Sequence, residues 1–505
     1  MALQRLVGDN LSKLGESIAH FSAKFSGYLS VIFSKFGWFL FHAVLVAGLV
    51  YLLLSSQPSF PSSQCFPSWM LTRERTNSRS PFSNNFRSPT KIGHILFGIA
   101  GSSKTWRNRG PYIDLWWEPN KTRGHVWLDS PPTKYPWPSS SPPFRISENT
   151  AIFNGYNKHE MPFAIRMARV LLESFNLGLS DVRWFVMGDD DTVFFVDNLV
   201  KVLAKYDHNK YFYIGGNSES VVQNMAHSYE MAFGGGGYAV SYPLAKALSR
   251  IFDDCIRRYQ TLYGSDHIIQ SCVAEVGVRL TKEPGFHQID LLGDIYGLLS
   301  AHPMSPLLSL HHLDYIAPIF PGMTRIQALK VLLKASKANP PQLLQQSICY
   351  HKEHNWSISV SWGYSVQIYQ KIYPPGFLTI PLQTFKPWRK SGVLSFMFNT
   401  RPLSTDPCEK PTVFFFDSVK PVSPFVNLIE TVYVGREDRS ISACNLNQSL
   451  PNIVDEVRIF SELQDIRVAG SRRQCCEVLP SSGMNVTEIR IRECLDDENV
   501  AFPLL

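Results

Sequence analysis

Three consecutive aspartates, Asp189-Asp190-Asp191, follow a short apolar run and are the residues of this sequence best suited to chemistry. Adjacent carboxylates repel one another, so all three cannot sit in a dry core. At the carboxyl end of a buried strand they would face the crevice in which open α/β sheets bind ligands. Their oxygens suit Mg²⁺ or Mn²⁺, which share their coordination with substrate phosphates. The alternative is an acidic surface turn between a strand and a helix.

Three further motifs could line the same site. Four successive glycines, Gly234–Gly237 in AFGGGGYAV, let a backbone approach a charged or flat ligand closely, although a flexible loop is the alternative. Asp266 begins a helical pattern, where it could be a general base or a helix cap. His311, in LSLHHLD, could supply the nitrogen ligand that carboxylates lack, or be an ordinary hydrogen-bonded histidine.

The elements that must position these residues indicate an α/β sheet. Apolar runs at residues 94–100, 183–187 and 211–215 predict buried strands. Apolar residues at helical spacing predict helices at 162–176 and 198–206. Strands that alternate with helices favour a sheet covered by helices on both faces.

From about residue 325 the composition changes. Residues 357–369 and 412–416 are rich in β-branched and aromatic side chains, and cysteines concentrate between Cys349 and Cys494. We therefore expect residues 325–505 to form a β-rich region that disulfides hold together. The nine cysteines include no CxxC pair, which argues against a zinc site.

The N-terminal part predicts a membrane anchor. Residues 36–54 carry no charged side chain, and about 20 such residues span a bilayer. The 35 residues before them are too many for a cleaved signal peptide. Lys24 and Lys35 place residues 1–35 in the cytoplasm and the rest of the chain in the lumen. Residues 55–91, rich in serine and proline, read as an extended stem.

Composition excludes some classes of protein and adds expectations about modification. The 505 residues are 44% hydrophobic, which is too apolar for a disordered chain. The net charge of +7 is concentrated in the N-terminal quarter, so we expect no nucleic-acid partner. The odd number of cysteines makes Cys65, in the stem, our candidate for a disulfide-linked dimer. Glycosylation sequons stand at Asn120, Asn355, Asn447 and Asn485.

The order of these motifs resembles the fringe-like β1,3-glycosyltransferases, and most closely their plant fringe-related branch, which are type II membrane proteins. The resemblance is carried by FVMGDDDTVFF, YIGGNSES and AFGGGGYAVSYPLA and covers roughly residues 92–420. It implies a GT-A-like nucleotide-sugar-binding domain at 92–324, a mixed sheet flanked by helices. Behind one transmembrane helix, that domain would be followed by the β-rich, cysteine-containing region at 325–505.

The same resemblance implies an activity. The expected protein is an inverting, metal-dependent glycosyltransferase that moves a sugar from a UDP-sugar to a hydroxyl of a glycan, glycoprotein or polysaccharide. It would use Mn²⁺ or Mg²⁺, make a β1,3 linkage and act in the Golgi lumen, as a single-pass type II protein of the Golgi membrane.

The resemblance also assigns roles to residues. Asp189, Asp191 and His311 would hold the metal, with Asp191 as the main carboxylate ligand, and Asp266 would be the catalytic base. The residues expected around the nucleotide sugar are Gly98, Ser102, Arg109, Asp189, Asp190, Gly234, Gly235 and Gly236.

Further details of the resemblance concern the segment around Asp266. Cys255 and Cys272 resemble a disulfide of the family. The chain departs from the family at Ser265, where a second acidic residue is common, and at His267, where fringe proteins carry an apolar or small residue.

Two other classes of function compete with this one. The first is a catalytically inactive, sugar-binding or scaffolding protein of the Golgi membrane. The second is a metal-dependent phosphohydrolase, which would need further metal ligands or a nucleophile, and the sequence shows no second cluster of such residues.

Overall fold

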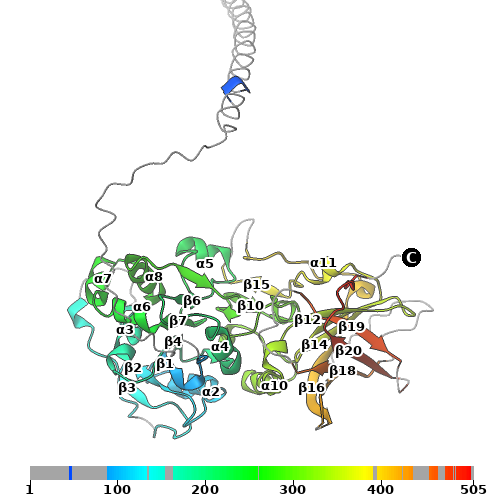
Figure 1. Ribbon diagram of the computed structural model, residues 1–505, viewed down its shortest axis with the longest axis horizontal. Helices are drawn as coiled ribbons and strands as arrows, with labels where there is room; N and C mark the ends of the chain where they lie inside the picture. Colours follow the sequence, from blue (N-terminus) through cyan, green and yellow to red (C-terminus); the bar gives the residue numbers. More distant parts are fainter. Residues whose placement is uncertain are drawn as a thin grey trace, which may run out of the picture. The chain divides into compact units, whose positions relative to one another are not determined.

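The computed structural model describes residues 45–47, 88–133, 136–153, 163–259, 261–389, 395–423, 425–435, 454–463, 472–480, 483 and 485–501. The chain divides into two units, residues 1–86 and 87–505, and the elements below belong to the second (Figure 1). The anchor expected at 36–54 and the stem expected at 55–91 lie outside the described residues except for 45–47 and 88–91, as do Cys65 and Asn447. Within the part that the structure describes, no helix has the length and apolarity needed to cross a bilayer.

A seven-stranded mixed sheet forms the first half of the unit. Its strands are β1 (Ile95–Ala100), β2 (Gly124–Leu128), β3 (Phe144–Ile146), β4 (Trp184–Asp189), β6 (Tyr213–Gly215), β7 (Tyr238–Ser241) and β8 (Leu280–Lys282), in the order β3-β2-β1-β4-β7-β6-β8. Strand β7 runs antiparallel to β4 and β6, and the other neighbours are parallel. The expectation of a mixed sheet with flanking helices is confirmed.

Helices cover both faces of this sheet because successive strand residues point to opposite sides. In β1, Leu96 and Ala100 pack into one cluster, whereas Ile95, Phe97 and Ile99 pack into the other. The first cluster includes side chains of α3 (Phe163–Asn176), α6 (Tyr242–Leu248), α7 (Phe252–Arg258) and α8 (Ser265–Glu275). The second includes side chains of α2 (Trp106–Asp114) and α4 (Val196–Leu203).

Two small sheets and several short elements complete the first half and connect it to the second. One sheet has the order β5 (Val193–Phe194), β11 (Ser309–Leu310), β9 (Phe286–His287), and the other pairs β10 (Leu291–Gly293) with β15 (Phe385–Pro387). The remaining α-helices are α5 (Val221–Ala226), α9 (Tyr296–Ser300), α10 (Arg325–Ala338) and α11 (Pro375–Leu378). Since β15 pairs with β10, a strand from beyond residue 325 is part of the first half.

An eight-stranded sheet dominates the second half, which is the β-rich region that the composition predicts. Its strands, in spatial order, are β12 (Gln346–His351), β13 (Trp356–Ser361), β14 (Ser365–Tyr369), β16 (Thr412–Ser423), β17 (Val426–Val434), β18 (Glu456–Glu462), β20 (Val486–Arg492) and β19 (Cys475–Leu479). A disulfide between Cys349 and Cys476 joins the first and last strands, so the sheet curls until its two ends meet. A second disulfide joins Cys475 to Cys494.

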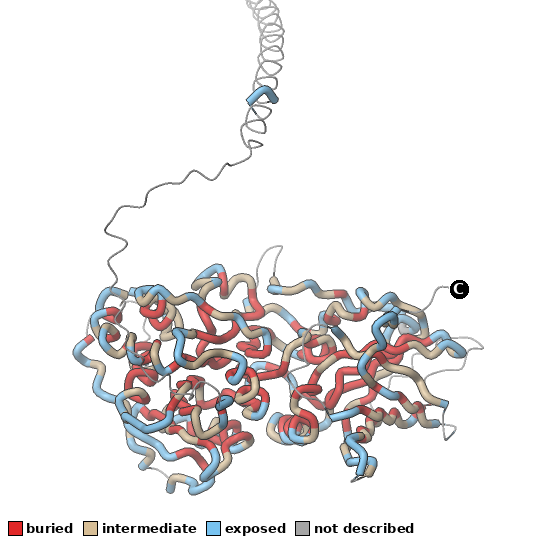
Figure 2. Tube along the Cα trace, viewed as in Figure 1, coloured by how far each residue is buried: buried red, intermediate tan, exposed pale blue. Residues whose placement is uncertain are grey.

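The hydrophobic core does not stop at residue 325. Phe97 and Trp184 of the first sheet belong to the same buried cluster as Leu332 of α10 and Phe414 and Val457 of the second sheet. Figure 2 shows buried segments running through both halves. The regions expected at 92–324 and 325–505 therefore share one core.

Two of the expected boundaries need correction. Helix α4 covers 196–203 rather than 198–206, because its last turns tighten: Lys205 and Tyr206 donate to the carbonyls of Val202 and Leu203, three residues back. Strand β6 begins at Tyr213 rather than at residue 211. The other predicted strands and helices of the first half agree with the structure to within two residues.

Candidate functional site

The small sheet β5-β11-β9 brings Asp191 and His311 together, although 120 residues separate them. Asp191 lies two residues before β5, and His311 directly follows β11. Val193 and Leu310 are antiparallel partners, so the residues just outside this pair lie side by side. The Nε2 atom of His311 is 3.1 Å from Oδ1 of Asp191 and 3.7 Å from Oδ2 of Asp189.

These three side chains fit a divalent cation. Asp189, Asp191 and His311 each offer one ligand atom, and the three atoms lie within 4.8 Å of one another. Asp191 is fully buried, and its Oδ2 atom accepts no hydrogen bond, although it lies 3.3 Å from the Arg109 guanidinium. A bound cation would add a second positive charge beside this buried carboxylate and so lower the cost of burying it. Two carboxylates and one imidazole suit Mn²⁺ or Mg²⁺.

The charges of this group depend on one another. Burial alone would lower the pKa of His311, but Asp191 and Asp189 raise it to about 9. Burial would raise the pKa of Asp191, but His311 and Arg109 outweigh burial and hold it well below its usual range. Burial raises the pKa of Asp189 to about 7. A metal ion would displace protons from His311 and Asp189, so its binding should strengthen as the pH rises.

Asp190 faces a different neighbour. Its Oδ1 atom is 3.0 Å from Nη1 of Arg109, on α2. Its Oδ2 atom accepts hydrogen bonds from the Thr105 hydroxyl at 3.0 Å and from the Ser102 backbone N–H at 3.4 Å. Ser102 follows β1, which is parallel to β4, so both loops leave the same edge of the sheet. The structure thus brings Ser102, Arg109 and Asp190 together. They lie beside Asp189, Asp191 and His311, which we call the metal group.

Asp266 is the second residue of α8, and it does not cap that helix. The N-cap is Gly264, whose φ of 86° glycine adopts without strain, and it makes no side-chain cap bond. Instead, Oδ2 of Asp266 accepts the backbone N–H of Gly234 at 2.9 Å, and Oδ1 accepts the Ser265 hydroxyl at 3.0 Å. Burial raises the pKa of the Asp266 carboxyl. The helix-cap alternative is therefore wrong.

The four-glycine segment passes between Asp266 and His311. A Cβ atom on Gly234 would overlap the Asp266 carboxylate, and one on Gly235 would overlap the His311 ring. The Gly236 N–H donates to Oε1 of Gln288 at 2.7 Å, and the carbonyls of Gly235 and Gly236 accept hydroxyls of Thr192 and Ser309. The segment is fixed at each of these points, unlike a flexible linker.

Gly98, one of the residues expected around the nucleotide sugar, lies within a strand rather than in a loop. It lies in the middle of β1, paired with Met187 on one side. It lines a small cavity that Asp189, Gly234 and Asp266 also line. Asp189 and Asp266 therefore border the same cavity.

Three further residues lie at the site, and the sequence predicted no role for them: Asp290, His312 and Trp388. His312 adopts a left-handed backbone with φ of 53°, and its Nδ1 atom is 3.0 Å from Oδ1 of the buried Asp290. Trp388 stacks on the His312 ring, with 4.7 Å between centroids and 2° between planes. His312 stands next to an expected ligand and could have been noticed. Trp388 could not, because it comes from the β-rich region.

The segment that carries Trp388 is tied to the first half at several points. Besides the pairing of β15 with β10, Val221 donates to the carbonyl of Ser395 at 3.2 Å and Met397 donates to the carbonyl of Glu219 at 2.9 Å. The second half of the chain therefore supplies side chains and backbone to the surroundings of the site.

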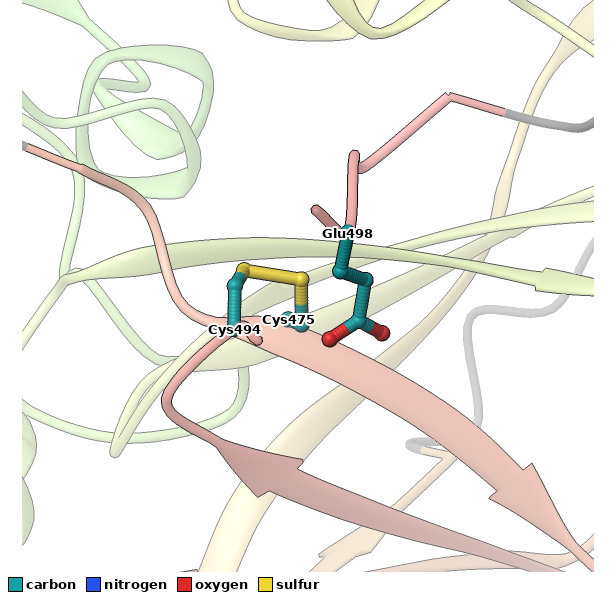
Figure 3. A group of neighbouring side chains, drawn as sticks. All are labelled: Cys475, Cys494 and Glu498. Carbon is teal, nitrogen blue, oxygen red and sulfur yellow. A yellow bond between two sulfur atoms is a disulfide. The ribbon is translucent and has the colours of Figure 1, made fainter. Parts of the chain in front are cut away.

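A second group of potential metal ligands, Cys475, Cys494 and Glu498, does not fit a metal (Figure 3). The two cysteines are joined in a disulfide and offer no thiolate. The Glu498 carboxylate is held by the Arg492 guanidinium at 2.7 and 3.0 Å, and these hydrogen bonds lower its pKa to about 2. By contrast, the expected disulfide between Cys255 and Cys272 is confirmed and links α7 to the Asp266 helix.

Comparisons with known proteins place the chain in a family and show two similar enzymes. A family model described as "Protein of unknown function, DUF604" matches residues 223–476, about half of the chain. The match includes the four glycines, Asp266, His311 and Trp388. Two curated relatives are the beta-1,3-glucosyltransferases of Mus musculus and Homo sapiens, each 29% identical over 119 residues. Those residues are 23% of this chain and 23% of each relative, so the chain spans about a quarter of the length of the curated relatives it matches.

Proposed function

The chain belongs to the DUF604 family of proteins of unknown function, and we propose that it is a glycosyltransferase that moves a sugar from a UDP-sugar to a hydroxyl of a glycan acceptor. The observation that carries the proposal is that the four-glycine segment meets Asp266 at Gly234 and His311 at Gly235, while Asp189 and Asp191 lie with His311 in one group of potential ligands. The similarity to two beta-1,3-glucosyltransferases supports it, and for the same reason we propose a β1,3 linkage.

On the donor side, Asp189, Asp191 and His311 would hold Mn²⁺ or Mg²⁺, which when bound supplies positive charge against the diphosphate of the donor. Arg109 holds Asp190 and Asp191 in place by ion pairs at 3.0 and 3.3 Å. The Arg109 side chain keeps 31% of its surface exposed, so its guanidinium could also donate hydrogen bonds to a phosphate. Ser102 and Asp190 would then lie on the nucleotide side of the site.

On the acceptor side, the Asp266 carboxylate would act as general base. An acceptor hydroxyl oxygen forms the new bond to the anomeric carbon, while the bond from that carbon to the diphosphate oxygen breaks and UDP leaves. The hydroxyl proton passes to Asp266, a role typically worth 10²–10⁴-fold in rate. Because attack and departure occur on opposite faces of the sugar, an α-linked donor yields a β-linked product, and the enzyme is inverting.

We also propose that the protein is a single-pass type II protein of the Golgi membrane, anchored by residues 36–54, with residues 87–505 in the lumen. Three disulfides in the described part of the chain are typical of an oxidising compartment. Three of the sequon asparagines, Asn120, Asn355 and Asn485, are exposed at the protein surface.

The test is a donor screen on the full chain in detergent. UDP release would be measured with each common UDP-sugar and mixed glycan acceptors, with Mn²⁺ and then with EDTA. We expect release with one donor, lost with EDTA and with Asp191→Ala, and retained by Asp197→Ala, which removes an exposed carboxylate six residues away. A chain that neither releases UDP nor binds UDP with Mn²⁺ in calorimetry would favour the scaffolding alternative.

A further inference from the structure

A cluster of aromatic side chains lies beside Asp266. His227 follows α5, and its ring stacks on Tyr263, with 5.5 Å between centroids and 26° between planes. The same ring meets His267 edge-on at 5.9 Å and Phe233 edge-on at 6.1 Å. These four residues come from two segments, the loop between α5 and β7 and the start of α8. We call them the aromatic cluster.

Each member of the cluster is related to Asp266 by its position in the sequence or by a neighbouring contact. His267 is its neighbour in sequence, and Tyr263 lies three residues before it. Phe233 precedes Gly234, whose N–H donates to Asp266. For His227, the charge of Asp266 is the largest effect that opposes the lowering of its pKa by burial. His311 meets the neighbouring glycine, Gly235, so a molecule that brings a hydroxyl to Asp266 can reach both the metal-ligand candidates and the aromatic cluster.

The chemistry of the cluster suits a sugar ring. Tyr263 is 44% exposed, and His227 and His267 are half-buried, so ring faces and polar tips are accessible together. Aromatic rings of this kind present an apolar face and a polar edge, as a pyranose ring also does. Burial lowers the pKa of both histidines, so they are neutral at pH 7 and each can donate one hydrogen bond and accept another.

We propose that His227 and Tyr263 form the acceptor subsite, on which a pyranose ring of the acceptor glycan stacks while one of its hydroxyls reaches Asp266. This inference rests on the proposed function, because it assigns the second substrate of the same site. It also gives a role to His267, the residue at which this chain departs from fringe proteins: His267 packs edge-on against His227 and holds its ring in place.

The experiment compares Tyr263→Ala and Tyr263→Phe in the full chain with the control Tyr211→Ala. Tyr211 is similarly exposed, at 49%, but precedes β6 at the opposite edge of the sheet from Asp189. With a panel of methyl glycosides as acceptors, Tyr263→Ala should raise the acceptor KM about tenfold or more and leave the affinity for UDP with Mn²⁺ unchanged. Tyr263→Phe and Tyr211→Ala should stay near the wild-type values.

A second measurement separates the two proposals. Saturation-transfer NMR would record binding of the same methyl glycosides to the wild type and to Tyr263→Ala, without any turnover. If the wild type transfers sugar but the acceptor KM of Tyr263→Ala is unchanged, the subsite is wrong and the proposed function stands. If the wild type transfers nothing but binds a glycoside that Tyr263→Ala does not, the function is wrong and the subsite stands. If the wild type neither transfers to a glycoside nor binds one, the subsite is wrong.

Discussion

The two halves of the compact unit bury polar groups in opposite ways. Up to residue 324 the buried side chains include many ionisable ones, namely Arg169, Glu173, Asp190, Asp191, Glu219, His287, Asp290, His302 and His311. In the described residues beyond 325, the buried polar side chains are serine, threonine, asparagine and glutamine, and Arg401 is the one charged exception. Because a buried charge costs far more than a buried hydroxyl with a partner, the first half keeps its charges for a purpose other than stability.

The polar groups of the second half are largely satisfied within the fold. The Ser361 hydroxyl donates to the carbonyl of Leu299 at 2.8 Å, and the hydroxyls of Ser365 and Ser300 are 3.0 Å apart. Both bonds join the eight-stranded sheet to α9 and so stabilise the junction between the halves. We interpret the second half, with its disulfides, as built for rigidity and the first half as built for the proposed chemistry. Substitutions in the two halves should therefore affect different properties.

The largest effect is expected for Asp266→Asn. The proposed base loses its negative charge, so sugar transfer should fall by 10²–10⁴-fold. Asparagine keeps an oxygen for the Gly234 N–H, and one buried charge is removed, so the melting temperature should not fall. The control Asp254→Asn removes a carboxylate that is 70% exposed on α7 and should leave transfer unchanged. Transfer by Asp266→Asn within threefold of the wild type would show that another group is the base.

In the second half we expect a loss of stability rather than of activity when the disulfide between the end strands of its sheet is removed. The double variant Cys349→Ser, Cys476→Ser opens a loop closed across 127 residues and should lose about 5 kcal/mol of unfolding free energy. The shorter loop of Cys255 and Cys272, 17 residues, should cost about 3 kcal/mol. Denaturant unfolding measures both.

In the same experiment, binding of UDP with Mn²⁺ at low temperature separates stability from function. The folded Cys349 and Cys476 variant should bind UDP as the wild type does, because the disulfide joins β12 to β19, two strands that carry none of the proposed site residues. A folded variant that binds UDP tenfold more weakly would mean that the division between a rigid half and a chemical half is wrong.

A smaller effect is expected for Gly235→Ala. The added methyl group overlaps the His311 ring, which must move away from Asp191. We expect the affinity for UDP with Mn²⁺ to fall about 100-fold, since a displaced ligand weakens a metal site strongly. Gly376→Ala, in α11 of the second half, meets open space and is the matched control. Unchanged affinity in Gly235→Ala would exclude His311 as a ligand.

The strands and helices of the first half could largely be predicted from the sequence, because its central strands are buried on both faces. Continuous apolar runs such as that of β1 follow from that burial, and the end of α3 at Asn176 follows from its helical spacing. Residue types suggested that His311 could join the aspartates as a ligand, but only the family resemblance favoured that role over an ordinary hydrogen-bonded histidine. No periodic pattern states which strands pair across more than 100 residues, and the pairing of β5 with β11 decides this contact.

For the second half, the composition predicted strands but not the order in which they pair. Residues 357–369 form the hairpin β13–β14, turned at Gly363 with φ of 74°, and the pairing of β18 with β20 is parallel. Strand propensity indicates that such segments are extended, but it does not indicate their order. The contact of Trp388 with His312 depends on that order, and for this reason it could not be predicted from the sequence.

A moderate effect on stability, with a defined pH dependence, is expected for Glu173→Gln in the first half. Glu173, on α3, is buried, and its Oε2 atom has no hydrogen-bond partner. Burial raises its pKa from 4.5 to about 7. Between these values the folded chain keeps a proton that the unfolded chain releases, so stability falls as the pH rises from about 4.5 to about 7. The loss is at most about 3 kcal/mol.

Glutamine stays neutral, so Glu173→Gln should remove most of this fall and be more stable than the wild type at pH 8 but not at pH 4.5. Unfolding free energies across this pH range measure the difference. Glu462→Gln, at an exposed position of β18, should keep the fall seen in the wild type. A Glu173→Gln variant with the same pH dependence as the wild type would assign the fall to another buried group.

The smallest effect is expected for Trp388→Ala, and it tests where the comparison between the halves breaks down. Trp388 comes from the half built for rigidity, yet it stacks on His312, the neighbour of the proposed ligand His311. Aromatic stacking of this kind contributes about 0.5–1.5 kcal/mol, so the affinity for UDP with Mn²⁺ should fall about three- to tenfold. Trp388→Phe should restore most of it, because a second aromatic ring can stack in the same place. Full affinity in Trp388→Ala would confine the chemistry to the first half. A loss that phenylalanine repairs would show that the second half also positions a metal ligand, through the segment that follows the pairing of β15 with β10.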